Sequence, residues 1–267
     1  MSFSIAGKTA IVTGASNGIG LAVAKRFADE GANVMLADFD EAKLIAEVGD
    51  QVKDDGPIRY FACDLCERLG HANLVSATLD AFERVDILVN AARSVKTSDP
   101  LDPEGDGVEY LIEKNLLSAL RLTQTVAKRM IKQTDDEDES PAGTIINLSS
   151  IAARRTHPEL LAYSIAAAGI DQMTRSMAVA LAPHRIRVNA VALGSVMSAS
   201  LRETLKDHSE MRDEITDHTP MARIAAPSEL ADTVQFLASD ASGFMTGQVL
   251  TVDGGRTLLD PVAASAH

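Results

Sequence analysis

The sequence predicts an α/β protein in which a parallel β-sheet is covered by helices on both faces. Short runs rich in β-branched residues alternate with helical patterns of period 3.6 from one end of the chain to the other, which is typical of strand–helix–strand units. Hydrophobic residues make up 46% of the 267 residues and Trp is absent. Val, Ile, Leu, Met and Ala must therefore fill the core, which suits a sheet buried on both faces.

The elements can be placed in chain order from these patterns. A helix is expected over 19–30 because Leu21, Val23 and Phe27 are apolar at helical spacing and polar residues occupy the other positions. Residues 94–107, rich in Pro, Gly and Asp, are expected to form an irregular loop. No fixed-period repeat and no interdomain linker is visible. The predicted strands are residues 9–13, 33–37, 58–63, 86–90, 144–149, 187–191 and 249–252.

Charge and cysteine content exclude several classes of protein. The net charge of −13 argues against nucleic acid as a partner, because phosphate binding needs clustered Lys and Arg, and against an anionic membrane surface. Two Cys cannot build a disulfide framework in a chain of this length. No stretch approaches the roughly 18 apolar residues of a membrane span, and the first apolar run is too short for a signal sequence. We expect a cytoplasmic protein without nucleic-acid or membrane partners.

The segment T-G-A-S-N-G-I-G at 13–20 lies between the first predicted strand and the first predicted helix. Its glycines allow a sharp turn and a close approach of the backbone to a ligand, and the free N–H groups at the helix start can then bind a pyrophosphate. The sequence therefore predicts a dinucleotide site. The expected contacts in this turn are Gly14, Ser16, Asn17, Gly18, Ile19 and Gly20.

Asp38 ends the second predicted strand, where a carboxylate can accept hydrogen bonds from the ribose hydroxyls of the adenosine. The same carboxylate repels a 2′-phosphate and no Arg lies beside it, which favours NAD over NADP. The alternative is a helix-capping Asp before Asp40.

Cys63-Asp64-Leu65-Cys66 has the C-x-x-C spacing, but a zinc site needs two more ligands and none is near. No metal is therefore expected. A better interpretation makes this segment the end of the third strand, with Asp64 reaching the adenine amino group and Leu65 beside it.

Several segments resemble the short-chain dehydrogenase/reductase family. Besides the glycine turn, D-I-L-V-N-A-A-R at 86–93 is similar to the family's D-I-L-V-N-N-A-G, and G-T-I-I-N-L-S-S at 143–150 is similar to its fifth strand. R-I-R-V-N-A-V-A-L-G at 185–194 and T-G-Q-V-L-T-V-D-G-G at 246–255 are similar to its later segments. The resemblance covers nearly the whole chain. It implies a Rossmann-type doubly wound fold with a seven-stranded parallel sheet and helices on both faces.

The resemblance also implies the domain organisation and the assembly. Residues 1–267 would form a single domain, with a cofactor half at about 1–150 and a catalytic and substrate part at about 143–255. Members of the family are often homotetramers or homodimers.

The resemblance further assigns the catalytic residues. Tyr163 stands at the family's acid/base position, and Ser150, thirteen positions earlier, stands where a serine holds the substrate oxygen. Asn115 matches the asparagine that anchors a helix and a proton-relay water. These residues imply an NAD-dependent oxidoreductase that interconverts a secondary alcohol and a ketone. Each also has a structural alternative: a tyrosine with a satisfied hydroxyl, a turn-capping serine and a buried polar anchor. The expected contacts at the nicotinamide end of the cofactor are Asn90, Ala91, Gly194, Val196 and Ser198.

Ala167 stands where the family has a lysine that binds the nicotinamide ribose and favours the ionised tyrosine. A unit charge at about 5 Å and an effective dielectric of about 20 is worth roughly 3 kcal/mol. Its loss is expected to lower the phenolate fraction at neutral pH about a hundredfold. Reduction of a ketone starts from the protonated tyrosine, so we expect weak activity or activity biased towards reduction. The alternative is an NAD-binding pseudoenzyme, acting as a sensor or a structural subunit.

Another cation can take the place of the lysine. No Lys occurs between Lys132 and Lys206, which excludes a shifted lysine on the same helix. Arg93 is the strongest candidate because it stands in the cofactor-facing segment where the family has glycine; its alternative is an exposed surface arginine. The loops that the family fold brings towards the site carry Arg93, Arg154, Arg155 and His157.

Overall fold

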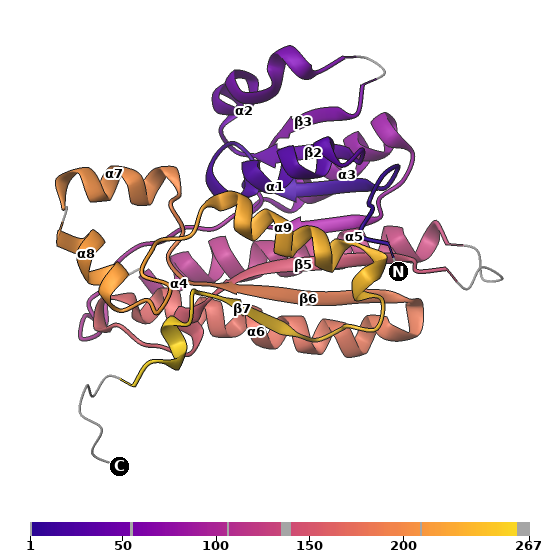
Figure 1. Cartoon of the computed structure of the whole chain (residues 1–267). Helices are drawn as coiled ribbons and strands as arrows, with labels where there is room; N and C mark the ends of the chain where they lie inside the picture. The colour runs from indigo at the N-terminus through magenta and orange to yellow at the C-terminus, as the bar shows by residue number, and fades with distance from the viewer. Residues whose placement is uncertain (1, 54–55, 106, 135–139, 209, 261–267) are drawn as a thin grey trace.

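Seven parallel strands form one sheet in the spatial order β3-β2-β1-β4-β5-β6-β7 (Figure 1), which confirms the predicted fold class. The computed structural model describes residues 2–53, 56–105, 107–134, 140–208 and 210–260. The strands are β1 Thr9–Thr13, β2 Asn33–Asp38, β3 Ile58–Ala62, β4 Ile87–Asn90, β5 Gly143–Ser150, β6 Ile186–Leu193 and β7 Val249–Val252. The helices are α1 Gly18–Asp29, α2 Glu41–Val48, α3 Arg68–Phe82, α4 Gly107–Leu111, α5 Ser118–Lys132, α6 Leu161–Leu181, α7 Ala199–Asp207, α8 Glu210–Asp217 and α9 Pro227–Ala238.

Both faces of the sheet are buried because side chains alternate along each strand. In β1, Ala10 and Val12 join an apolar cluster with α1, α2 and α9, which includes Phe27. Ile11 joins the cluster on the other face with α3, α5 and α6, which includes Leu122. The helices therefore lie in two layers, one on each side of the sheet.

The order of the strands reverses at β1, which lies between β2 and β4. In open parallel sheets, ligands bind in the crevice outside the carboxyl ends of the strands at such a point. The last residues of β1, β2, β4, β5 and β6 are Thr13, Asp38, Asn90, Ser150 and Leu193. Helices α7 and α8, which follow the carboxyl end of β6, extend away from the sheet at the left of Figure 1.

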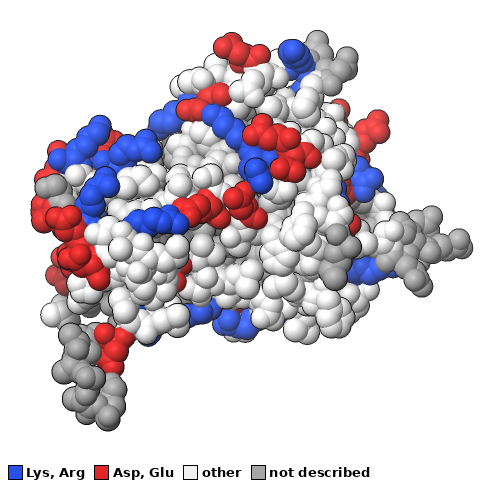
Figure 2. Space-filling model, viewed as in Figure 1, with Lys and Arg blue, Asp and Glu red and all other residues white. Residues whose placement is uncertain are grey.

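The surface carries charges of both signs. On the face seen in Figure 2, Lys and Arg side chains are interspersed with Asp and Glu. None of the described helices combines the length and the apolar character needed to cross a membrane.

The first turn of α9 yields a prediction about stability and pH. Both carboxylate oxygens of Glu229 accept from Arg223, at 2.6 and 2.7 Å, and Oε2 also accepts the Ala226 amide at 2.8 Å. Arg223 and this amide lower the pKa of Glu229 from 4.5 to about 2. Because the pKa is lower in the folded chain, the stabilisation is complete above pH 4.5 and is lost as the pH falls through about 2.

The change Glu229→Gln is therefore expected to lower the free energy of unfolding near neutral pH and to have a smaller effect at about pH 3. The Glu229 side chain is 41% exposed, so solvent screening keeps the loss below about 1 kcal/mol. Urea unfolding at both pH values measures it. Asp232→Asn is the control, since it removes another exposed carboxylate of α9, which lies 3.1 Å from Arg26. A Glu229→Gln protein as stable as the wild type near neutral pH would contradict the prediction.

Candidate active site

The glycine turn between β1 and α1 is built so that only glycine fits at its key positions. Gly14 and Gly18 have φ values of +62° and +56°, in the left-handed region that favours glycine. A Cβ atom at Gly14 would lie 2.7 Å from the Cα atom of Ala92, and one at Gly20 would collide with the carbonyl oxygen of Gly14. Asn17 precedes α1, and its side chain does not cap the helix among the described contacts. The amides at the start of α1 are therefore left for another acceptor.

Asp38 lies beside this turn, at the carboxyl end of β2. The residue is 7% exposed. One carboxylate oxygen accepts the Ser16 amide at 3.1 Å, and the other accepts the Asp40 amide at 3.2 Å. The residue that caps α2 is Asp40, whose side chain accepts the Lys43 amide at 3.1 Å. Asp40 is therefore the residue that caps α2, whereas Asp38 is hydrogen-bonded to the glycine turn.

Asp64 follows β3 and pairs with Lys114 at 3.1 Å. Its Oδ1 also accepts the Cys66 amide at 2.8 Å. This amide, together with Lys114, holds the pKa of Asp64 below its ordinary value. The Leu65 carbonyl oxygen lies 2.6 Å from Nε2 of His71. The end of β3 is thus tied to the segment that carries Asn115, a link that the sequence did not indicate.

The C-x-x-C thiols have little capacity as ligands or nucleophiles. Burial raises the pKa of the Cys63 thiol to about 11, and it also raises the pKa of Cys66, so both favour the neutral thiol. In the described parts of the chain, no group of three or more His, Cys, Asp and Glu side chains is arranged to hold a metal ion.

Asn115 lies in a π-helical turn, Ile112–Leu117, between α4 and α5. Its side chain makes two hydrogen bonds with the backbone of Ser94: the Ser94 amide donates to Oδ1 at 2.7 Å, and Nδ2 donates to the Ser94 carbonyl at 2.8 Å. Insertions of this kind often occur at functional sites. Asn115 therefore fixes the loop after β4 to the interrupted helix.

Tyr163 lies in the first turn of α6 and is 8% exposed. It packs with Leu111, Ala152 and Ala166, and its hydroxyl oxygen lies 3.3 Å from Nη1 of Arg93. Ser150 ends β5 and accepts the Ala152 amide at 3.1 Å. Ser150 thus caps a turn, as its structural alternative supposes, but a capping hydroxyl keeps its hydrogen free to donate. Ala152 links the two predicted catalytic residues, because its amide donates to Ser150 and its side chain is in the same apolar cluster as Tyr163.

The face of α6 beyond Tyr163 carries Ala167 and Asp171, each one helical turn after the last. Ala167 is 3% exposed. The buried Asp171 carboxylate accepts from Ser149 Oγ at 2.6 Å and lies 3.6 Å from Arg154. Asp171 was not among the predicted site residues; its spacing of eight residues from Tyr163 is the signal that places both on one helical face.

The other predicted cations have different partners. Arg154 also donates to Thr251 Oγ1 at 3.1 Å, and Arg155 donates to the Thr257 carbonyl. The ring of His157 accepts the Glu159 amide at 3.3 Å. Arg93 is the predicted cation that contacts Tyr163.

The residues predicted at the nicotinamide end lie along the strand ends. Asn90 Nδ2 donates to Thr123 Oγ1 at 2.9 Å and to Asn147 Oδ1 at 2.8 Å, so its side chain is a buried structural link. A Cβ atom at Gly194 would lie 2.8 Å from the backbone of Asp253. The remaining three are Ala91, whose amide donates to Thr13 Oγ1 at 3.0 Å, Val196, which forms a bridge with Ala225, and Ser198, which caps α7.

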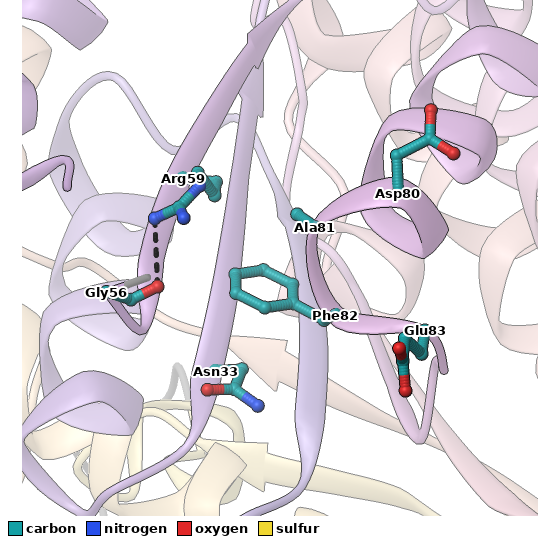
Figure 3. A pocket seen from close by; sticks show the side chains of 7 residues that line it. All are labelled: Asn33, Gly56, Arg59, Asp80, Ala81, Phe82 and Glu83. Carbon is teal, nitrogen blue, oxygen red and sulfur yellow. Dashed lines mark hydrogen bonds between the residues drawn. The ribbon is translucent and has the colours of Figure 1, made fainter. Parts of the chain in front are cut away.

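A separate cavity of about 350 Å³ lies near the amino end of β2 and the carboxyl end of α3 (Figure 3). Asn33, Arg59 and Phe82 line it; Arg59 donates to the Gly56 carbonyl at 2.8 Å and lies 5.8 Å from the centroid of the Phe82 ring. Asn33 is the first residue of β2, whereas Asp38 is its last. The cavity therefore lies at the other end of the strand and is not part of the candidate active site.

A glycine-rich strand-to-helix turn and an acid after the next strand, on a doubly wound parallel sheet, define the class of Rossmann-type folds. A family model described as enoyl-(acyl carrier protein) reductase matches residues 14–257. A 3-oxoacyl-(acyl-carrier-protein) reductase of Thermotoga maritima is 32% identical over 252 residues, 94% of this chain and 98% of that protein. The 7alpha-hydroxysteroid dehydrogenase of Escherichia coli strain K12 is 31% identical over 250 residues, 93% of this chain and 94% of that protein.

A solved structure agrees. A short-chain type dehydrogenase/reductase from Mycobacterium marinum superposes with a TM-score of 0.86 at 28% identity, covering 96% of this chain and 98% of that chain. The chain therefore belongs to the short-chain dehydrogenase/reductase family, whose members are oxidoreductases that act on CH–OH groups with NAD(H) or NADP(H).

Proposed function

We propose that the protein is an NAD-dependent oxidoreductase that interconverts a small secondary alcohol and its ketone, with Tyr163 as the proton donor and acceptor. The observation that supports this most is that Tyr163 is buried and its hydroxyl oxygen lies 3.3 Å from the Arg93 guanidinium. Two of the relatives are by name a 3-oxoacyl-(acyl-carrier-protein) reductase and a 7alpha-hydroxysteroid dehydrogenase, which supports chemistry between a ketone and a secondary alcohol.

The residues present fit a nicotinamide dinucleotide. The positive-φ glycines Gly14 and Gly18, and the lack of room for a side chain at Gly20, leave a backbone cradle at the start of α1. Asp38 lies next to it with its carboxylate towards the turn. When bound, the dinucleotide supplies or accepts the hydride. The proposed contacts are those named from the sequence, in the glycine turn, after β2 and β3, and at the ends of β4 and β6.

The chain's own residues then handle the proton. Tyr163 donates its hydroxyl proton to the carbonyl oxygen during reduction and takes it back during oxidation. Ser150 keeps a hydroxyl hydrogen with which to hold the same oxygen. Asn115 fixes the loop after β4 by its two bonds to Ser94, so the tyrosine and the cofactor face keep one geometry.

Ala167 leads to a proposal on direction. No lysine extends from α6 one turn after Tyr163, where the buried Ala167 lies. Reduction starts from the neutral phenol and oxidation from the phenolate, so the enzyme is proposed to be weak or biased towards reduction near neutral pH. The same observation favours the second candidate function, an NAD-binding pseudoenzyme that serves as a sensor or structural subunit.

Turnover assays distinguish the two functions. Purified protein is mixed with NADH and a panel of ketones, and with NAD and the matching alcohols, and the reduced nicotinamide absorbance is followed. The oxidoreductase predicts NADH consumption with at least one ketone, and faster reduction than oxidation at neutral pH. Binding of NADH without turnover across a broad panel would favour the pseudoenzyme. Equal rates in the two directions near neutral pH would contradict the proposed bias.

The coenzyme preference yields a prediction at Asp38. The change Asp38→Asn keeps an oxygen to accept the Ser16 amide and removes the negative charge, so the preference for NADH over NADPH is expected to fall at least about tenfold. Calorimetric dissociation constants for both coenzymes measure it. Asp40→Asn is the control, because it removes a charge two residues away that caps α2. An unchanged ratio in Asp38→Asn would refute this assignment of coenzyme specificity.

Assembly and location are proposed on family grounds. We propose a homodimer or homotetramer in the cytoplasm, one domain over 1–267 with a cofactor half at about 1–150 and a catalytic part at about 143–255. Cys63 and Cys66 are both free thiols, which supports a reducing compartment.

A further inference from the structure

Arg93 is the charged side chain that touches the proposed catalytic hydroxyl. Its Nη1 lies 3.3 Å from the Tyr163 oxygen. It approaches from the loop after β4, whereas Ala167 leaves the neighbouring turn of α6 without a charged group. Two elements far apart in the sequence, the loop after β4 and the first turn of α6, therefore meet at this contact.

The backbone on both sides of Arg93 is held in place. The Ala91 and Ala92 amides donate to Thr13 Oγ1 at 3.0 and 3.1 Å. On the other side, Ser94 makes two backbone hydrogen bonds with Asn115. The backbone at Arg93 is thus fixed between the glycine turn and the π-helical turn, so that only the side-chain rotamers of Arg93 remain to be ordered when the guanidinium contacts Tyr163.

The charge of Arg93 is not cancelled by a carboxylate. Within the described part of the chain, Arg93 forms no ion pair, whereas several charged groups on the elements packed against the start of α6 do. Those pairs are Arg154 with Asp171 at 3.6 Å, Lys114 with Asp64 at 3.1 Å and Arg121 with Glu113 at 2.5 Å. The loop before α6 also carries Arg155, His157 and Glu159: Arg155 donates to the Thr257 carbonyl, and the Glu159 backbone amide donates to Nδ1 of His157.

We infer that Arg93 is a catalytic residue that supplies, from the loop after β4, positive charge that stabilises the Tyr163 phenolate and offsets in part the lysine missing at Ala167. The inference rests on the proposed function for its role in turnover, while the contact itself does not. A guanidinium donates hydrogen bonds but accepts none. The phenol must therefore accept from Arg93, which leaves its own hydrogen to point at the substrate oxygen. Once Tyr163 has released that proton, the contact becomes a charge-assisted bond to a phenolate.

Direct titration of Tyr163 tests the inference without substrate or coenzyme. The chain has three Tyr and no Trp, so the near-ultraviolet tyrosinate band is clear, and the difference between wild type and Tyr163→Phe isolates one residue. In Arg93→Ala, Tyr163 is expected to ionise at a pH about one unit or more higher than in the wild type. Arg93→Lys keeps a charge and is expected to lie between them. Lys96→Ala is the control, since Lys96 lies in the same loop over the Tyr110 ring, and it is expected to match the wild type.

Circular dichroism verifies that each variant is folded, and Arg93→Gln replaces Arg93→Ala if the latter is not. Equal ionisation of Tyr163 in wild type and in the folded charge-removed variant would overturn the inference.

Steady-state kinetics of alcohol oxidation give a second test, which includes a double variant designed to restore the lost activity. Arg93→Ala is expected to lower kcat for alcohol oxidation near neutral pH about tenfold to a hundredfold and to move the pH–rate profile to higher pH. KM for the alcohol is expected to change little. The double variant Arg93→Ala/Ala167→Lys is expected to recover much of the loss, because a lysine returns from the helix side. Wild-type rates and profile in Arg93→Ala would overturn the inference and leave the proposed function standing. A wild type without turnover would defeat the proposed function, and the titration would still decide the inference.

Discussion

The change Tyr163→Phe is expected to lower kcat/KM about a thousandfold or more in both directions, since a positioned acid or base contributes about 10² to 10⁴ in rate. The phenyl ring keeps the packing against Leu111, Ala152 and Ala166. Coenzyme affinity and the unfolding transition are therefore expected to stay close to the wild type. Steady-state rates with NADH and a ketone, beside calorimetric binding of NADH, measure both effects.

Tyr110→Phe is the matched control for this change. Tyr110 lies on α4 and is exposed, with Lys96 5.5 Å from the centroid of its ring, a contact that a phenyl ring retains. This variant is expected to keep wild-type activity. Activity within tenfold of the wild type in Tyr163→Phe would show that the proton comes from another group.

The change Gly20→Ala is expected to weaken binding of NADH at least about a hundredfold, which corresponds to roughly 2.7 kcal/mol. The added Cβ would collide with the Gly14 carbonyl and lie 2.9 Å from the Thr13 oxygen. Backbone atoms cannot rotate away as a side chain can, so the turn must open and its amides lose their common direction. Overpacking of this kind also costs about 1 to 3 kcal/mol of stability. Calorimetry and urea unfolding measure the two losses.

Gly7→Ala is the control for backbone strain alone. Gly7 has a φ of +75°, but a Cβ there meets nothing within 4 Å. This variant is expected to lose about 1 kcal/mol of stability and to bind NADH normally. Wild-type affinity in Gly20→Ala would contradict the role assigned to the glycine turn.

The fold was predictable because the local sequence pattern of each strand and helix agrees with its place in the sheet. Alternation of strand and helix, and an apolar content without Trp, predict a parallel sheet covered by helices on both faces, and the resemblance to the family implies its doubly wound, seven-stranded form. The strand ends were less predictable, because pairing with neighbours extends a strand. Residues 143–150 of β5 and 186–193 of β6 pair over eight positions, whereas the sequence indicated six and five.

Those parts of the candidate site that depend on the residue type at a single position were predictable from the sequence. The glycine turn follows from positive φ and close backbone contacts, which only glycine tolerates. Partnerships across the fold were not predictable: Asp64 with Lys114, and Asp171 with Ser149, join segments 50 and 22 residues apart. The sequence indicated Arg93 as a candidate cation through its unusual position, but its contact with Tyr163 required the meeting of the loop after β4 with α6.

Calorimetric titration of the wild-type protein with NAD, NADH and their 2′-phosphorylated forms tests the central claim most directly. A dinucleotide held by the glycine turn beside Asp38 predicts one NADH per chain with a dissociation constant between about 1 µM and 1 mM, and weaker binding of NADPH. Absence of binding by all four coenzymes at millimolar concentration would contradict the proposed oxidoreductase and the pseudoenzyme alike.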